Sequence, residues 1–183
     1  MRIVSRLMTF LLVSLLLSSC QFQCKMGDVK GKEKPVVNKP VHTDEGAIIY
    51  NGIQVNAHKV KVNKAYLVLK NGERVPDDNF VDFTQDVKMI LLINEGWVEE
   101  NGKVLLGVSE KVVAENGTVL LDQEDLFSSN TEGLTAADAK ILGLSVTFDH
   151  VTIGQPTYMS VYYKIWDKKG EGYVEGSYKL YSK

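Results

Sequence analysis

The side chains that could perform acid–base chemistry are few and scattered in this chain. The histidines are His42, His58 and His150. None lies in a metalloprotease, nucleophile-elbow, phosphate-loop or Cys-x-x-Cys motif, the short patterns that position catalytic groups. Asp149 precedes His150, but neighbouring residues of a strand point to opposite faces. We therefore expect no enzyme and no catalytic residue, and a small hydrolase would need His58, His150 and a loop carboxylate to meet in one pocket.

Two acidic clusters raise the question of a calcium site. The first contains Asp77, Asp78 and Asp82, and the second contains Asp122, Glu124 and Asp125. Calcium takes about six to eight oxygen ligands, which the loops of a β-domain can supply. Neither cluster has the spacing of the calcium-loop motif, and acidic residues are common in turns because of their local hydrogen bonds. We therefore expect no metal and no other cofactor, with the first cluster as the alternative.

Aromatic residues near the C-terminus indicate a different chemistry, that of ligand binding. They alternate with apolar residues in the segments 158–166 and 173–181, and they are Tyr158, Tyr162, Trp166, Tyr173 and Tyr181. Exposed aromatic rings stack on sugar faces or anchor a protein partner. Alternatively, another part of the chain covers these rings, or tyrosine merely favours strands. The pattern predicts a non-enzymatic binding face for a protein or a glycan.

The strands that must carry these rings are predicted to form a hairpin. A turn at Lys169-Gly170 sets Ile165 opposite Val174 and Trp166 opposite Tyr173. All the apolar residues of both segments then share one face, and the five aromatic residues share the other. A slip by one residue would place polar groups in the core, so we expect this register even if the turn is longer.

The N-terminus has the pattern of a secretory signal. Arg2 and Arg6 precede a mostly apolar stretch at residues 7–17, and two serines then precede Cys20. Such a charged segment, apolar segment and small-residue site are typical of a signal peptide. The apolar stretch is shorter than the ~20 residues that a spanning helix needs. We expect residues 1–19 to be a removed signal peptide, and in the alternative interpretation Cys20 is an ordinary cysteine.

The end of this leader, Leu17-Ser18-Ser19-Cys20, resembles the lipobox of bacterial lipoprotein precursors, and the resemblance covers the leader alone. It implies cleavage before Cys20, diacylglycerol on the thiol and an acyl chain such as palmitate on the new amino group. It further implies an exported lipoprotein that is anchored in a membrane of the cell envelope and faces the periplasm or the cell surface. Cys24 lacks a lipobox and is the weaker anchor.

Charge and composition divide the rest of the chain into a tether and a body. Residues 20–44 contain two prolines and carry a net charge of +2, whereas residues 45–183 carry −6. The first stretch predicts a lipidated flexible tether, and the second has the size of a single domain. A basic tether below an acidic body suits an anionic bilayer. The acidic body argues against nucleic acid as a partner.

Turn chemistry indicates that the body is all-β. Asn-Gly pairs begin at Asn51, Asn71, Asn101 and Asn116. Both residue types tolerate the positive φ that the type I′ hairpin turn needs, so each pair predicts a hairpin.

The segments between the turns have the period of strands. The apolar positions of residues 58–69 change parity near Asn63, which predicts either a bulge or two strands. Residues 87–93 are apolar on both faces, as in a central strand. Only residues 135–141 look helical, with Thr135 as the expected N-cap.

These elements predict an antiparallel β-sandwich of immunoglobulin-like architecture with about seven to nine strands and at most one short helix. A closed barrel is the alternative. The expected function is that of a membrane-anchored lipoprotein with a binding domain at residues 45–183. A structural or assembly subunit of a surface structure, pairing through sheet edges, is the alternative.

Overall fold

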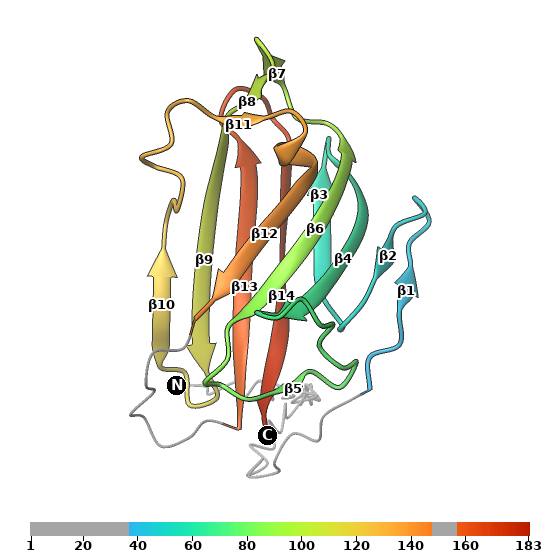
Figure 1. Cartoon of the computed structure of the whole chain (residues 1–183), viewed down its shortest axis with the longest axis vertical. Helices are drawn as coiled ribbons and strands as arrows, with labels where there is room; N and C mark the ends of the chain where they lie inside the picture. The colour runs from blue at the N-terminus through green and yellow to red at the C-terminus, as the bar shows by residue number, and fades with distance from the viewer. Residues whose placement is uncertain (1–36, 148–156) are drawn as a thin grey trace, which may run out of the picture. The chain divides into compact units, whose positions relative to one another are not determined.

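A computed structural model describes residues 37–147 and 157–183 (Figure 1). These residues contain fourteen strands and one 3₁₀ turn. Eight of the strands have five residues or more, so the number of substantial strands agrees with the expectation. The predictions for Cys20, Cys24, Asp149 and His150 lie outside the described residues.

The first sheet, sheet A, has the strand order β1-β2-β4-β6-β12. Its strands are β1 (Val41–His42), β2 (Ile48–Ile49), β4 (Lys61–Leu69), β6 (Val87–Glu95) and β12 (Ile141–Val146). The predicted central strand is β6, which pairs with β4 on one side and β12 on the other. Because β1 pairs with β2, the folded part begins before residue 45, where the sequence pattern placed the end of the tether.

The second sheet, sheet B, has the order β10-β9-β13-β14-β3, with β5 also beside β14. Its strands are β3 (Gln54–His58), β5 (Phe80–Val81), β9 (Leu106–Ala114), β10 (Val119–Gln123), β13 (Tyr158–Asp167) and β14 (Tyr173–Ser182). A small third sheet contains β7 (Glu99–Glu100), β8 (Lys103–Val104) and β11 (Leu134–Thr135).

Sheets A and B pack face to face as a β-sandwich, and the long strands are antiparallel. One buried cluster joins the inner faces, with Leu67 and Leu91 from sheet A and Ile165 and Leu180 from sheet B. Figure 1 shows β4, β6 and β12 lying over β13 and β14. The strands of the described residues form separate sheets, not a closed barrel. Two short pairs, β2 with β4 and β5 with β14, are parallel.

The predicted C-terminal hairpin is confirmed in its register. Ile165 pairs with Val174 and Trp166 with Tyr173 in the β13–β14 ladder. The turn is longer than two residues, because β13 ends at Asp167 and β14 begins at Tyr173. The Asp167 carboxylate accepts hydrogen bonds from the backbone N–H groups of residues 169 and 170 and so shapes this loop.

The Asn-Gly pairs form turns of two kinds. Asn101 and Gly102 both have positive φ and join β7 to β8, as a type I′ hairpin requires. At Asn116-Gly117, which joins β9 to β10, only the glycine has positive φ. The same is true of Asn71-Gly72, whose turn closes through hydrogen bonds between residues 69 and 73.

The prediction of a hairpin at Asn51-Gly52 is wrong. Both residues have positive φ, but the turn leads from β2 of sheet A to β3 of sheet B. The Asn51 side chain is buried, donates to the carbonyls of Val75 and Pro76 and to Asn79 Oδ1, and accepts from the Leu67 N–H. Asn79 in turn donates to the carbonyl of Lys179 on β14. The pair therefore ties the two sheets together.

The two remaining local predictions are resolved by the structure. The β4–β6 register shifts around Asn63, so this position is a bulge, and β3 and β4 are also separate strands that meet at Lys59, where φ is 56°. The helical segment reduces to a 3₁₀ turn at Asp138–Lys140. The prediction of Thr135 as the N-cap is wrong, because the N-cap of this turn is Ala137, which makes no side-chain capping bond. Thr135 ends β11, and its hydroxyl accepts a local hydrogen bond from the Asp138 N–H at 3.1 Å.

Candidate functional site

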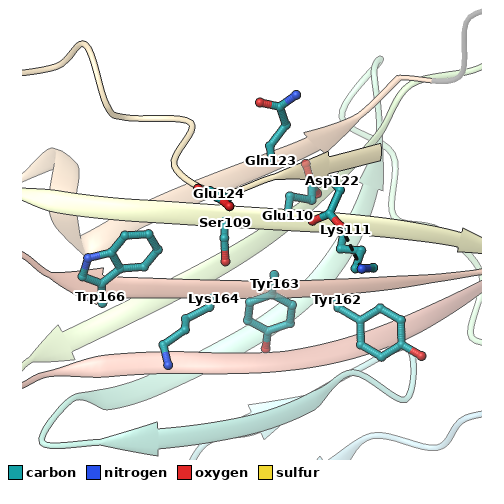
Figure 2. A pocket seen from close by; sticks show the side chains of 10 residues that line it. All are labelled: Ser109, Glu110, Lys111, Asp122, Gln123, Glu124, Tyr162, Tyr163, Lys164 and Trp166. Atoms are coloured by element: carbon teal, nitrogen blue, oxygen red, sulfur yellow. Dashed lines mark hydrogen bonds and ion pairs between the residues drawn. The ribbon is translucent and has the colours of Figure 1, made fainter. Parts of the chain in front are cut away.

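An open groove of about 660 Å³ lies on the outer face of sheet B (Figure 2). Outward-facing residues of β9 and β13 and the end of β10 form most of its lining. The lining residues are Ser109, Glu110, Lys111, Asp122, Gln123, Glu124, Tyr162, Tyr163, Lys164 and Trp166. Ligand pockets typically have volumes of ~300–1,000 Å³, so the groove has room for a small ligand.

Two aromatic side chains mark the ends of the groove. Figure 2 shows Trp166 and Tyr162 at opposite ends, with Lys164 between them. The three residues alternate along β13 and therefore share one face. Tyr162 is 47% exposed, so its ring is available to a ligand.

The Trp166 ring has its place because the residue opposite it has no side chain. Gly107 is the direct partner of Trp166 in the β9–β13 ladder. A Cβ on Gly107 would lie 2.2 Å from Cε2 and Cζ2 of the indole, so the ring packs against the glycine backbone. Sequence reasoning missed Gly107, since the pairing of β9 with β13 joins segments about fifty residues apart and no hairpin fixes its register.

The lysines of the groove already have carboxylate partners. Lys111 Nζ lies 2.7 Å from Asp122 Oδ2, and Lys164 Nζ lies 3.0 Å from Glu175 Oε2. Within the described residues, Gln123 and Glu124 make no side-chain hydrogen bond. The groove therefore has no surplus positive charge but retains free polar groups beside its rings.

A buried carboxyl group lies beneath the groove. Glu110 alternates toward the sandwich interior, is only 3% exposed, and has no hydrogen-bond partner at Oε1. Burial raises the pKa of Glu110 to about 7. The hydroxyl of Tyr178, on the inner face of β14, is also buried without a partner. Burial raises the pKa of Tyr178, and the nearby Glu110 and Tyr163 raise it further.

The other predicted aromatic residues lie on the same outer face but outside the groove. Tyr158 packs against Tyr181 with ring centroids 6.1 Å apart, and Phe80 contacts Tyr181 at 5.8 Å. Tyr173 stacks on His58 at 5.3 Å. In this groove the structure places Tyr162 and Trp166 beside the free polar side chains. Tyr158 packs on Tyr181 of β14, while Tyr181 and Tyr173 contact aromatic neighbours from β5 and β3.

The predicted acidic clusters serve their own loops. Asp77 Oδ1 pairs with Arg74 at 2.9 Å, and Asp78 accepts from the Phe80 N–H. Asp82 accepts from both the N–H and the hydroxyl of Thr84, and these bonds lower the pKa of Asp82. No three potential metal-ligating side chains gather anywhere in residues 37–147 and 157–183.

The second acidic cluster divides between two roles. Asp122 contributes to the groove through its ion pair with Lys111. Asp125 Oδ1 accepts from the N–H groups of Val108 and Phe127, and its other oxygen lies 2.7 Å from Lys168 Nζ. Burial acts to raise the pKa of Asp125, but the hydrogen bonds from Lys168, Val108 and Phe127 outweigh it and lower the pKa. The same bonds hold the loop after β10 against β9.

His58, the one predicted hydrolase residue that the structure describes, lies at the end of β3 against Tyr173. Its proposed partner His150 is outside the described residues. In the part of the chain that the structure describes, no helix is long and apolar enough to cross a bilayer.

Comparison with known proteins adds one structural likeness. No protein-family model matches the chain, and no curated protein matches it. Among solved structures, the C-terminal domain of wzt aligns with a TM-score of 0.47 and 11% sequence identity, over 72% of this chain and 78% of that chain. The chain's own strands and core define its class, a β-sandwich with a polar and aromatic groove on one outer face.

Proposed function

We propose that this protein is a membrane-anchored lipoprotein of the cell envelope whose sandwich domain binds a glycan in the groove of sheet B. The observation that carries the proposal is the placement of Tyr162 and Trp166 at the two ends of one groove, beside Gln123 and Glu124. Aromatic rings stack on the apolar faces of sugars. Amide and carboxylate groups bind the hydroxyls around those faces.

The charge pattern supports an uncharged sugar over an acidic ligand. Both lysines of the groove are paired with carboxylates, so binding an anion would require breaking an ion pair. A protein segment is the alternative occupant, since tyrosine and tryptophan are also common anchors at protein interfaces. The open form and free polar groups favour the glycan, because sugar hydroxyls need several hydrogen-bond partners when water is displaced.

Ring truncation in the full-length protein tests this proposal. A screen of envelope oligosaccharides followed by calorimetric titration should find a ligand. The double variant Tyr162→Ala/Trp166→Ala should weaken its binding by about a hundredfold or more, as expected when two central aromatic contact residues worth about 2 kcal/mol each are truncated. The protein should remain folded with a modest decrease in unfolding temperature, since Tyr162 is exposed and the half-buried Trp166 packs on Gly107 and not in the core.

Tyr158→Ala is the matched control, because Tyr158 shares the outer face but lies outside the groove. It should leave binding within about twofold of wild type, since distant residues couple weakly. If the domain binds no glycan but binds a protein, and Tyr162→Ala abolishes that binding, the ligand of the groove is a protein and not a glycan. Concentration-dependent self-association through sheet edges would instead favour the assembly subunit.

The anchor is supported by the leader and its similarity to a lipobox. If Cys20 carries the lipid, Cys20→Ala should move the protein from the membrane fraction to the soluble fraction. Cys24→Ala is the matched control and should leave it in the membrane fraction. Release by Cys24→Ala alone would show that the mature N-terminus has been assigned to the wrong cysteine.

A further inference from the structure

A second pocket, of about 270 Å³, adjoins the groove on the outer face of sheet B. Tyr162 lines both cavities, whereas Trp166 lines the groove and Ser160 lines the second pocket. Figure 2 shows Tyr162 at the end of the groove opposite Trp166, and Ser160 lies two residues beyond Tyr162 on β13. From Trp166 to Ser160 the strand extends for roughly 20 Å, at ~3.3 Å per residue. The two cavities therefore follow one another along β13, with Tyr162 between them.

The second pocket also extends across the strands of sheet B. Gln54 of β3 pairs with Ser177 of β14, and Ser177 pairs on its other side with Tyr162. Tyr162 pairs in turn with Lys111 of β9, which lines the groove. Paired residues of neighbouring strands point to the same face. Because strands lie ~4.8 Å apart, this row of four side chains spans about 14 Å.

Several polar groups in the second pocket are free to bind a ligand. Within the described residues, the hydroxyls of Ser160 and Ser177 make no hydrogen bond. The Gln54 side chain donates over 3.4 Å to the carbonyl of Gly52, and its Oε1 accepts no hydrogen bond there. Each hydroxyl can donate one hydrogen bond and accept two, and the amide oxygen can accept two. The pocket therefore offers neutral donors and acceptors beside an aromatic ring.

The second pocket differs from the groove in its charge. No carboxylate is among its described lining residues, and Lys179 is the one cation among them. The Lys179 ammonium lies 4.7 Å from the ring centroid of Tyr158, within the range of a cation–π contact. Most hydrogen-bonding groups that face a ligand here are therefore uncharged, as suits the hydroxyls of a neutral sugar.

We propose that sheet B binds a linear, uncharged oligosaccharide that passes from the groove over Tyr162 into the second pocket. One sugar stacks at Trp166 and another at Tyr162, because aromatic rings pack on the apolar faces of sugars. The next sugar places its hydroxyls against Gln54, Ser160 and Ser177. The inference rests on the proposed glycan binding and adds the length and the path of the ligand, since a single sugar is too small to contact both Trp166 and Ser160.

A series of ligand lengths tests the path. The full-length protein is titrated calorimetrically with linear oligomers of glucose, mannose, galactose and N-acetylglucosamine, from the disaccharide to the hexasaccharide. In the series that binds, affinity should rise by about tenfold or more from the disaccharide to the hexasaccharide, which corresponds to ~1.4 kcal/mol of additional contact.

A double variant locates the additional contact. Gln54→Ala/Ser177→Ala should weaken binding of the hexasaccharide by about tenfold, since each lost hydrogen bond is worth ~0.5–1.5 kcal/mol. Binding of the disaccharide, which stacks in the groove, should stay within about twofold of wild type. Asn56→Ala is the matched control. Asn56 is another exposed amide on the same face of β3, but its side chain donates to Glu175 and lines neither cavity, so both affinities should be retained.

The outcomes separate this inference from glycan binding itself. A hexasaccharide that binds no more tightly than the disaccharide would overturn the inference and leave the groove as a glycan site. Equal losses for both lengths in Gln54→Ala/Ser177→Ala, or no loss for either, would do the same. Binding of no oligomer in any of the four series would overturn both the inference and the proposed function.

Discussion

The two outer faces of the sandwich have the same strand alternation but differ in how completely their lysines are paired with carboxylates. On sheet B, lysines and carboxylates pair across neighbouring strands, and an indole packs over Gly107. On sheet A, Lys61 pairs with Glu95 across β4 and β6, whereas Lys64 and Lys88 have no carboxylate partner among the described residues. The difference indicates that the pairing of lysines with carboxylates across strands, more than the overall composition, determines which ligands each outer face can bind.

The inner faces differ as well. The inward residues of sheet A's long strands are apolar, for example Leu67, Met89 and Leu144. The inner face of sheet B includes Glu110, Tyr163 and Tyr178 among its apolar residues. Sheet B therefore has a titratable group directly beneath its groove, whereas sheet A presents an apolar layer to the core.

The largest expected effect concerns the joint between the two sheets. Asn51→Ala should lower the free energy of unfolding by about 3–4 kcal/mol, because the Leu67 N–H and several buried acceptors would lose their partner. Asn71→Ala, in another Asn-Gly turn, is the control. Its side chain bonds locally to Glu73 at the surface, so the cost should stay below about 1 kcal/mol. Urea unfolding measures both, and equal costs would contradict the assigned joint.

The next prediction concerns pH. Because burial raises the pKa of Glu110 from 4.5 to about 7, its protonated form is favoured in the folded state. Its contribution to stability is complete below pH 4.5, declines as the pH rises, and is lost above pH 7. The loss should amount to roughly 3 kcal/mol, at about 1.4 kcal/mol per pKa unit.

Glu110→Gln isolates this contribution, since every other titrating group is shared with the wild type. The free energies of unfolding of the two proteins should diverge between pH 4.5 and 7, with the variant more stable at pH 8. Parallel pH profiles would show that the carboxyl group is not held in its neutral form.

A pair of glycine variants compares the outer faces directly. Gly107→Ala must displace the Trp166 ring and should weaken glycan binding by about tenfold, a loss typical of one misplaced contact residue. Gly143→Ala, on sheet A, places a Cβ 3.1 Å from Cδ of the flexible Lys88 side chain. It should leave binding unchanged. Titration of both variants with the same glycan measures the two affinities. Equal losses of affinity would show that the position of the Trp166 ring has no special role in binding.

The smallest expected effect tests the charge pairing. Lys111→Met breaks the exposed ion pair with Asp122 and should cost up to about 0.5 kcal/mol of unfolding free energy, less at high salt. Lys88→Met removes a lysine with no such pair and should cost nothing measurable. Thermal unfolding at low and high salt measures the stability of both variants. A larger loss of stability for Lys88→Met than for Lys111→Met would contradict the assigned charge pairing.

Some strands of the site could be predicted from the sequence and others could not. The pairing of β13 with β14 was predicted residue by residue, because a short connection and strict alternation leave one register that buries every apolar side chain. The contributions of Gly107, Gln123 and Glu124 depend on β9 and β10, whose approach to β13 is a long-range pairing. Local patterns do not specify such pairings.

The same limit explains the error at Asn51-Gly52. Its sequence specifies the turn, and the structure has the expected positive φ at both residues. Whether the following strand returns to the same sheet depends on partners far along the chain, here Val75, Asn79 and Lys179. For the same reason, alternation alone could not tell which aromatic residues would find neighbours such as Phe80 and His58.

The fluorescence of Trp166 offers the most direct test of the central claim, that the sheet B groove binds a glycan. Trp97→Phe leaves Trp166 as the only tryptophan, and Trp97 lies outside the groove, with its Nε1 donating to Ala139. Titration of this full-length variant with envelope oligosaccharides should give a saturable change in emission that Tyr162→Ala abolishes. Emission that no oligosaccharide changes, or a change that persists in Tyr162→Ala, would contradict the claim.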